Sequence, residues 1–187
     1  MAVTVFTWDM FRGGVGHASM HVHGPAGNIY ISFWPAEHAV KQALASVGKI
    51  HFMRADKNAD GMPSWASRPI NSLDEARIVQ FWRGYDASPY LDYKGSASRN
   101  TVKSNEGGKT YNILASQCST TVVAALLAGA NRETRVKIER WLLLNAGTNV
   151  DFPGIKLLQA FVPLLRVPTV TPADVRELVI SVWGDAP

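Results

Sequence analysis

Apolar and polar residues alternate in the amino-terminal part of the chain, and this alternation predicts β-strands. Residues 2–11 are rich in Val, Phe, Thr and Trp, which favour a strand. After a glycine-rich break, residues 17–24 place His and Ser on one face and Ala, Met and Val on the other. The turn at residues 25–27 then leads to a third predicted strand over residues 28–34, which would pair with the second as a hairpin.

Short elements and loops are expected in the middle of the chain. Apolar spacing predicts a helix over residues 36–47 and a brief strand over 50–53. Residues 54–69 are interpreted as a loop. Ser72 has a Glu three residues later, a pattern typical of a capped helix start, and this helix would extend to about residue 85.

Helical periodicity dominates the later part of the chain. A polar surface excursion over residues 86–109 and a brief strand over 111–114 precede a helix that Ser116 would cap. This helix begins at residue 117 or 118 and ends at Gly129, and its apolar residues leave no polar side, so it should be buried all round. Further helices are predicted over residues 132–144, 155–165 and 171–182, the last with Thr171 as its cap.

These elements predict an α+β fold in which a small antiparallel sheet packs on the buried helix and additional helices follow. A chain of 187 residues can bury one substantial core, so residues 1–187 are expected to form a single domain. Apolar residues make up 47% and charged residues 18%, which excludes a disordered chain.

Charge and hydropathy exclude several other classes. The net charge of +4 is small and scattered, so a nucleic-acid partner is not expected. The span free of charge at residues 110–131 is too polar in its first half to cross a membrane, so no transmembrane segment is predicted. The first residues carry no basic leader, apolar stretch or small-residue cleavage site, and no Sec signal is predicted.

A lone thiol at the start of a helix is the main candidate for chemistry. Cys118 is the single cysteine, so it cannot form an internal disulfide. Unpaired N–H groups and the dipole at a helix N-terminus favour the thiolate, which predicts a lowered pKa and a nucleophile at Cys118. A nucleophile needs a base, and His17, His21 and His23 share one face of the second predicted strand.

Other interpretations stay open at this stage. Cys118 could be a small buried hydrophobe in a non-catalytic binding module. The row of histidines could be a solvated strand face, or His17 with His21 or His23 could bind zinc, although no carboxylate or second Cys lies nearby in sequence.

A calcium site is a further alternative in the middle of the chain. Asp56, Asn58 and Asp60 copy the first half of a calcium-binding loop. Ser67 stands at the twelfth position, where such a loop needs Glu, so a turn-rich surface loop is the competing interpretation.

Several short motifs carry a family resemblance. GHASM at residues 16–20, YISFWP at 30–35, YNIL at 111–114 and CSTTV at 118–122 resemble, in that order, the circularly permuted papain-like cysteine hydrolases, in which His precedes Cys. With the Thr-Pro-x-Asp-Val segment at residues 171–175, the chain is similar to bacterial hydrolase toxins delivered by type VI secretion.

The resemblance implies a permuted papain-like fold and a mechanism. Cys118 would attack a carbonyl carbon, His17 would be the base and later the acid, and N–H groups at the helix start would stabilise the oxyanion. Family members often have Asn before the Cys. Gln117 holds that place here and is the candidate oxyanion residue.

A third polar residue should orient His17. A hairpin turn centred on residues 25–26 places Ser32 opposite Ser19 and Trp34 opposite His17. Ser32 and His21 are therefore the candidate orienting residues, with Glu37 as a more distant one.

The resemblance also implies substrate and setting. The expected activity is that of an amidase or peptidase on peptidoglycan peptides, with no metal or cofactor. Acyltransferase, thioesterase or deubiquitinase-like activity is the alternative within the same fold. A toxin of this type would be made in the cytoplasm, injected into the periplasm of a target cell and restrained in its producer by a cognate immunity protein.

Overall fold

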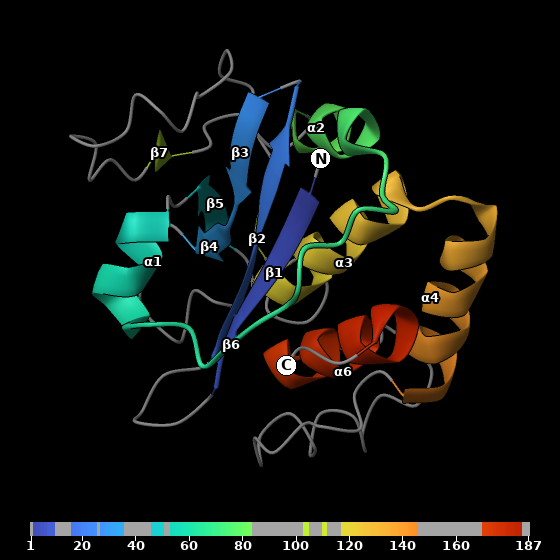
Figure 1. Cartoon of the computed structure of the whole chain (residues 1–187). Helices are drawn as coiled ribbons and strands as arrows, with labels where there is room; N and C mark the ends of the chain where they lie inside the picture. The colour runs from blue at the N-terminus through green and yellow to red at the C-terminus, as the bar shows by residue number, and fades with distance from the viewer. Residues whose placement is uncertain are drawn as a thin grey trace.

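A computed structural model of the chain has an α+β architecture with a small antiparallel sheet, as the sequence predicts (Figure 1). The residues that it describes are 2–9, 16–25, 27–35, 46–50, 53–83, 103–104, 110–111, 117–145 and 170–184.

The first sheet has the strand order β3-β2-β1-β6, and each neighbouring pair is antiparallel. β1 and β2 pair along their whole lengths, which sets Trp8 opposite His17. The strands are β1 (Ala2–Trp8), β2 (His17–Gly24), β3 (Gly27–Ile31) and β6 (Trp65–Ala66).

The predicted hairpin is confirmed in its register but not in its length. β2 and β3 pair from Gly24–Gly27 to Met20–Ile31, the register that the turn at residues 25–26 predicts. The chain then leaves the first sheet at Ser32, whereas the sequence predicted one strand through residue 34. The pairing with β3 therefore stops before it reaches the first residues of β2.

A second sheet receives the chain after this break. Its order is β4-β5-β7, and β8 also pairs with β5. Residues 46 and 47, predicted as the end of a helix, belong instead to β5. The strands are β4 (Phe33–Pro35), β5 (Ser46–Ile50), β7 (Lys103–Ser104) and β8 (Thr110–Tyr111).

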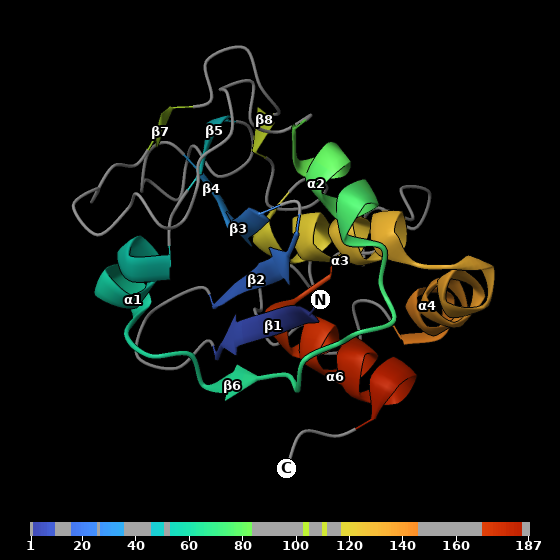
Figure 2. The same ribbon diagram turned by 45° about the horizontal axis from the view of Figure 1, so that its top comes forward.

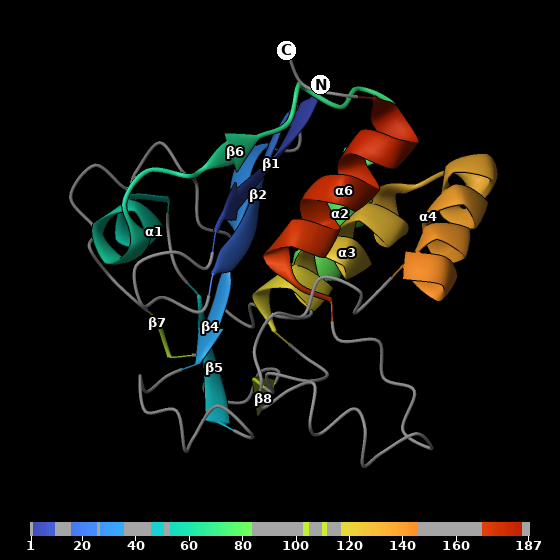
Figure 3. The ribbon, with the colours of Figure 1, turned by 90° about the horizontal axis from the view of Figure 1, so that it is seen from below.

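Helices lie on both sides of the first sheet. Figures 2 and 3 show α2, α3 and α6 on one face with α4 outside them, while α1 lies on the opposite face. α3 contacts β2, α6 contacts β1, and α4 packs on α6. The helices are α1 (Met53–Asp60), α2 (Glu75–Arg83), α3 (Cys118–Gly129), α4 (Arg132–Asn145) and α6 (Pro172–Trp183).

Strand alternation decides which side chains of β2 enter the core. Met20 and Val22 face α2, α3 and α6 and have no exposed surface. The alternate residues His17, Ser19 and His21 face the side of α1 and are also buried, with 0 to 6% of their surface exposed. A polar strand face is thus enclosed within the protein, where its groups need hydrogen-bond partners.

Four predicted helices are confirmed, and they are α2, α3, α4 and α6. α3 is buried along most of its length, as its apolar sequence predicts. In α6, Thr171 Oγ1 accepts the N–H of Asp174 at 3.1 Å, and Asp174 Oδ2 accepts the N–H of Thr171 at 2.8 Å. This capping box gives the Thr-Pro-x-Asp motif a structural role.

The predicted loop over residues 54–69 is wrong at its start, where α1 forms, and at Trp65–Ala66, which form β6. Gly61, with a φ of 79°, ends this helix and donates its N–H to the carbonyl of Lys57 at 3.0 Å. Asp56 is the fully buried residue among those of α1 whose burial is described. The segment therefore lacks the apolar period that reveals a helix in a sequence.

The predicted start of α2 is also wrong. Asp74 Oδ1 accepts the N–H of Arg77 at 3.1 Å, so Asp74 caps the helix that begins at Glu75. Ser72 instead accepts a hydrogen bond from Trp183 Nε1 at 3.0 Å. The hydroxyl thus joins the segment before α2 to the end of α6.

Some predictions fall outside the described residues. These are the helix over residues 36–45, most of the excursion over 86–109, strand residues 112–114, the Ser116 cap, Glu37 and the helix over 155–165. In the part of the chain that the structure describes, no helix is long and apolar enough to cross a membrane.

Candidate active site

Cys118 is the first residue of α3, and only 5% of its surface is exposed. Gln117 precedes it in extended conformation and donates its backbone N–H to Thr120 Oγ1 at 2.8 Å, which fixes the start of the helix. N–H groups in the first turn of a helix favour negative charge beside them. The fold therefore places the thiol where a thiolate is stabilised.

His17 is the first residue of β2, and its ring is enclosed by two indoles. Its centroid lies 5.3 Å from that of Trp8 on β1 and 4.4 Å from that of Trp34 on β4. Only 1% of the surface of His17 is exposed. Because large aromatic rings pack on it from two strands, the imidazole has a fixed orientation.

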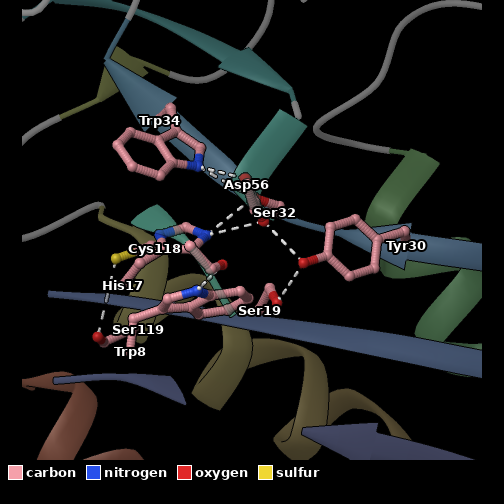
Figure 4. A network of polar contacts seen from close by, with 10 residues as sticks. Trp8, His17, Ser19, Tyr30, Ser32, Trp34, Asp56, Cys118 and Ser119 are labelled. Atoms are coloured by element: carbon pink, nitrogen blue, oxygen red, sulfur yellow. Dashed lines mark hydrogen bonds and ion pairs between the residues drawn. The ribbon is translucent and has the colours of Figure 1, made fainter. Parts of the chain in front are cut away.

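The sulfur of Cys118 lies beside the ring of His17 (Figure 4), and the charges of the two side chains interact. Figure 4 shows the sulfur on one side of the imidazole and the oxygen atoms of Ser32 and Asp56 on the other. The backbone N–H of Ala18, in the part of β2 that does not pair with β3, lowers the pKa of Cys118. The structure thus joins the first turn of α3 to the first residues of β2.

Nε2 of His17 contacts two oxygen atoms. Ser32 Oγ lies 3.0 Å from this nitrogen, and Oδ2 of Asp56 lies 3.1 Å from it. Since Nε2 is engaged there, Nδ1 is the nitrogen available to Cys118. A carboxylate at Nε2 holds a proton on that nitrogen and leaves Nδ1 free to accept the thiol proton.

Asp56 reaches His17 from α1, on the face of the sheet opposite α3. Oδ2 accepts a hydrogen bond from Tyr30 Oη at 2.7 Å, and Oδ1 accepts one from Trp34 Nε1 at 2.9 Å. Asp56 has no exposed surface, so these donors replace the water that a charged carboxylate would otherwise need. Trp8 Nε1 donates to the carbonyl of Gly61 at 2.9 Å and ties the end of α1 to β1.

The electrostatics of the site favour a thiolate and an imidazolium. Burial opposes charge on His17, but the charges of Asp56 and Cys118, with their hydrogen bonds, raise its pKa to about 10. Burial likewise opposes the thiolate, yet the charge of His17 and its hydrogen bond lower the pKa of Cys118 from the usual thiol value. Between these two pKa values the pair is charged.

The structure brings Cys118, His17 and Ser32 together, three of the residues that the sequence singled out. It does not bring His21 to Nε2 of His17, because four residues along a strand span about 13 Å. The ring of His21 lies instead beside His23, at 3.7 Å between centroids, and Tyr30, at 6.2 Å.

Gln117 has a structural contact that the sequence did not predict. Its Nε2 donates to the backbone carbonyl of Val170 at 2.7 Å and so joins the start of α3 to the residue before the α6 cap. One amide hydrogen is therefore occupied. The oxyanion role of Gln117 stays a prediction.

Asp56 is the site residue that the sequence analysis missed. The interpretation of residues 54–69 as a loop assigned it to a calcium-like motif, but α1 is a helix and its Asp56 carboxylate bonds to His17, Tyr30 and Trp34. The calcium-loop alternative is therefore wrong. Gly61 was the available signal, since a glycine often follows the last turn of a helix.

A metal site was the other alternative for the histidine row. Among the residues with a described placement, no group of three His, Cys, Asp or Glu side chains is arranged to hold a metal ion.

No known protein family, curated protein or solved structure matches the chain.

Proposed function

We propose that the protein is a cysteine hydrolase with Cys118 as nucleophile, His17 as general base and acid, and Asp56 as the residue that positions the histidine. One observation carries the proposal: the imidazole of His17 lies between a thiol at a helix N-terminus and a fully buried carboxylate. Ser32 supplies a second oxygen at Nε2, 3.0 Å away.

Acylation would begin with the thiolate of Cys118 attacking a carbonyl carbon. A carbon–sulfur bond forms and the carbonyl electrons move to oxygen. N–H groups at the start of α3 stabilise the negative charge that develops there. The intermediate then collapses, the carbon–nitrogen bond breaks, and the leaving amine takes the proton from His17. The products are a thioester on Cys118, a free amine and a neutral imidazole.

Deacylation would use the same residues in reverse. His17, now neutral, takes a proton from water as the oxygen attacks the thioester. The carbon–sulfur bond breaks, a carboxylic acid leaves, and the thiolate and imidazolium are restored. Asp56 stays ionised throughout and stabilises the imidazolium.

The fold and the substrate are also part of this proposal. A cysteine at the start of a helix that packs on an antiparallel sheet, with the histidine earlier in the chain, supports a permuted papain-like fold. By that resemblance we propose amide bonds of peptidoglycan peptides as substrate, an injected antibacterial effector as setting and a cognate immunity protein as partner. Thioesters and acyl esters would react through the same acyl-enzyme, so experiment must choose between them.

A first experiment tests whether Cys118 is a nucleophile, independently of the substrate. Iodoacetamide should label Cys118 in the folded protein at neutral pH, and His17→Ala should slow the labelling strongly. Thr121→Val is the matched control, since Thr121 is a buried hydroxyl of α3 whose Oγ1 has no hydrogen-bond partner among the described residues. A thiol that reacts only after unfolding would refute the proposed enzyme.

Purified sacculi then test the substrate. The wild-type protein and Thr121→Val should release peptides that mass spectrometry detects, whereas Cys118→Ala should release none. Rapid labelling without peptide release would support a cysteine hydrolase but reject peptidoglycan as its substrate.

A further inference from the structure

A chain of hydroxyl groups leads from β2 to the carboxylate behind His17. Ser19 Oγ lies 2.6 Å from Tyr30 Oη, which lies 2.7 Å from Oδ2 of Asp56 (Figure 4). Ser19 has no exposed surface and Tyr30 only 5%. Both hydroxyl groups lie behind Asp56 and His17 as seen from Cys118, so they can act on the thiol only through that pair.

The protons of this chain point in one direction. A phenol has a single proton, and Tyr30 gives it to Asp56, so Tyr30 Oη must accept and Ser19 Oγ must donate. Trp34 Nε1 donates to the second carboxylate oxygen at 2.9 Å. The negative charge of Asp56 is therefore shared with neutral donors on both oxygens as well as with His17.

The titratable groups around this carboxylate come from several elements. His17 of β2 and Tyr30 of β3 contact Asp56 directly, and Cys118 of α3 lies beside His17 (Figure 4). His21 lies beside Tyr30, and burial above all lowers its pKa to about 4, so it is neutral at neutral pH. A titration observed at Cys118 in the neutral range thus reports on the His17–Asp56 pair.

We infer that Tyr30, with Ser19 behind it, is a positioning residue that limits the basicity of the His17–Asp56 pair, an inference that rests on the proposed hydrolase. A carboxylate that accepts neutral hydrogen bonds attracts the imidazolium proton less strongly than one without them. His17 must give that proton to the leaving amine, and an acid that holds it too tightly is a poor catalyst. Tyr30 therefore favours proton release over thiolate formation.

Removing the hydroxyl of Tyr30 and removing the charge of Asp56 should therefore act in opposite directions. In Tyr30→Phe the buried carboxylate has one donor fewer and attracts the His17 proton more strongly, so the thiolate of Cys118 forms at lower pH. In Asp56→Asn the imidazolium loses its partner, so the thiolate forms at higher pH. If the hydroxyl of Tyr30 only filled space, its removal would leave the pH of thiolate formation unchanged.

The experiment measures the rate of iodoacetamide labelling of Cys118 against pH in the full-length protein. Tyr30→Phe should lower the pH midpoint by about one unit, the size expected for one hydrogen bond to a charged group. Ser19→Ala should lower the midpoint by less than Tyr30→Phe does. Tyr30 then keeps its hydrogen bond to Asp56 and loses only the hydrogen bond that the Ser19 hydroxyl donates to it. Thr7→Val is the matched control and should not move the midpoint, since Thr7 is a buried hydroxyl of β1 whose Oγ1 has no hydrogen-bond partner among the described residues.

A second measurement follows the loss of the His17 proton at alkaline pH. NMR signals of the His17 ring should show the imidazolium surviving to higher pH in Tyr30→Phe than in the wild type. An unchanged midpoint in both Tyr30→Phe and Ser19→Ala, or an upward shift like that of Asp56→Asn, would overturn the inference. If Tyr30→Phe fails to fold, the direction of the Ser19→Ala shift decides. A wild-type thiol without a lowered midpoint would instead reject the proposed function itself.

Discussion

The carboxylate of Asp56 and Nε2 of His17 lie 3.1 Å apart, although 39 positions separate the two residues in the chain. They come from α1 and from the first residue of β2, and both are buried. Removing one member of a buried charged pair leaves the other without compensation, so this contact should matter more than any surface ion pair of the protein.

Asp56→Asn should reduce turnover by about 100-fold, within the range that general acid–base catalysis contributes. The amide keeps the size of the side chain but cannot compensate the charge of the imidazolium. Ser32→Ala should cost only about fivefold, the effect of one neutral hydrogen bond, because Asp56 still orients the ring. Steady-state rates of peptide release compare the two variants, and equal losses would contradict the ranking.

The pH dependence of labelling follows from the two shifted groups. The pKa of Cys118 is lowered, so labelling of the wild-type protein should already be rapid at pH values below the usual thiol range. His17, with a pKa of about 10, should keep its positive charge until the pH approaches that value. His17→Ala should raise the labelling midpoint, since the charge of His17 is the largest of the influences that lower the pKa of Cys118. The urea-unfolded chain supplies the reference profile.

His21 should make the folded protein sensitive to mild acid. Burial, assisted by the charge of His23, lowers the pKa of His21 from 6.5 to about 4. Between these values the unfolded chain binds more protons than the folded one, so stability is lost as the pH falls through this window. The free energy of unfolding should drop by about 2 kcal/mol between pH 7 and pH 5 from this group alone.

Urea unfolding at both pH values measures this loss in the wild type, His21→Gln and His23→Gln. His21→Gln should remove the loss. His23→Gln should keep most of it, because burial is the larger cause of the shift. A loss of the same size in His21→Gln would assign the acid sensitivity to another group.

Gly129 permits the close approach of α2 to the end of α3. A Cβ at this position would lie 2.6 Å from Cγ1 and Cδ1 of Ile78 and 3.1 Å from the carbonyl oxygen of Asp74. Gly129→Ala should therefore destabilise the protein by about 1–3 kcal/mol through overpacking. The change lies at the end of α3 opposite Cys118, so the labelling profile should stay as in the wild type.

A double-mutant cycle tests the cause. Ile78→Ala removes both Cγ1 and Cδ1, the two atoms nearest to the new methyl group, so the double variant should lose less stability than the sum of the two single changes. Strictly additive losses, measured by urea unfolding, would show that Ile78 is not the group in conflict.

Local sequence patterns predicted much of the fold. The alternation in residues 17–24, the turn after Gly24 and the apolar run after Cys118 predicted β2, its register with β3 and the buried α3. These features are local because side-chain period and turn geometry depend on neighbouring residues. The same register placed Ser32 opposite Ser19 and made it a candidate to orient His17, which it contacts, and the helix start predicted the lowered pKa of Cys118.

Tertiary structure decided the rest. Asp56 is polar, lies in a segment without apolar period and becomes part of the site only because α1 crosses to the polar face of the first sheet. The separation of β4 from β3 at Ser32, and the contact of Gln117 with Val170, likewise depend on where distant segments pack. A sequence determines its local conformations directly, but which buried polar groups meet is set by the whole packed chain, because each must find its partner there.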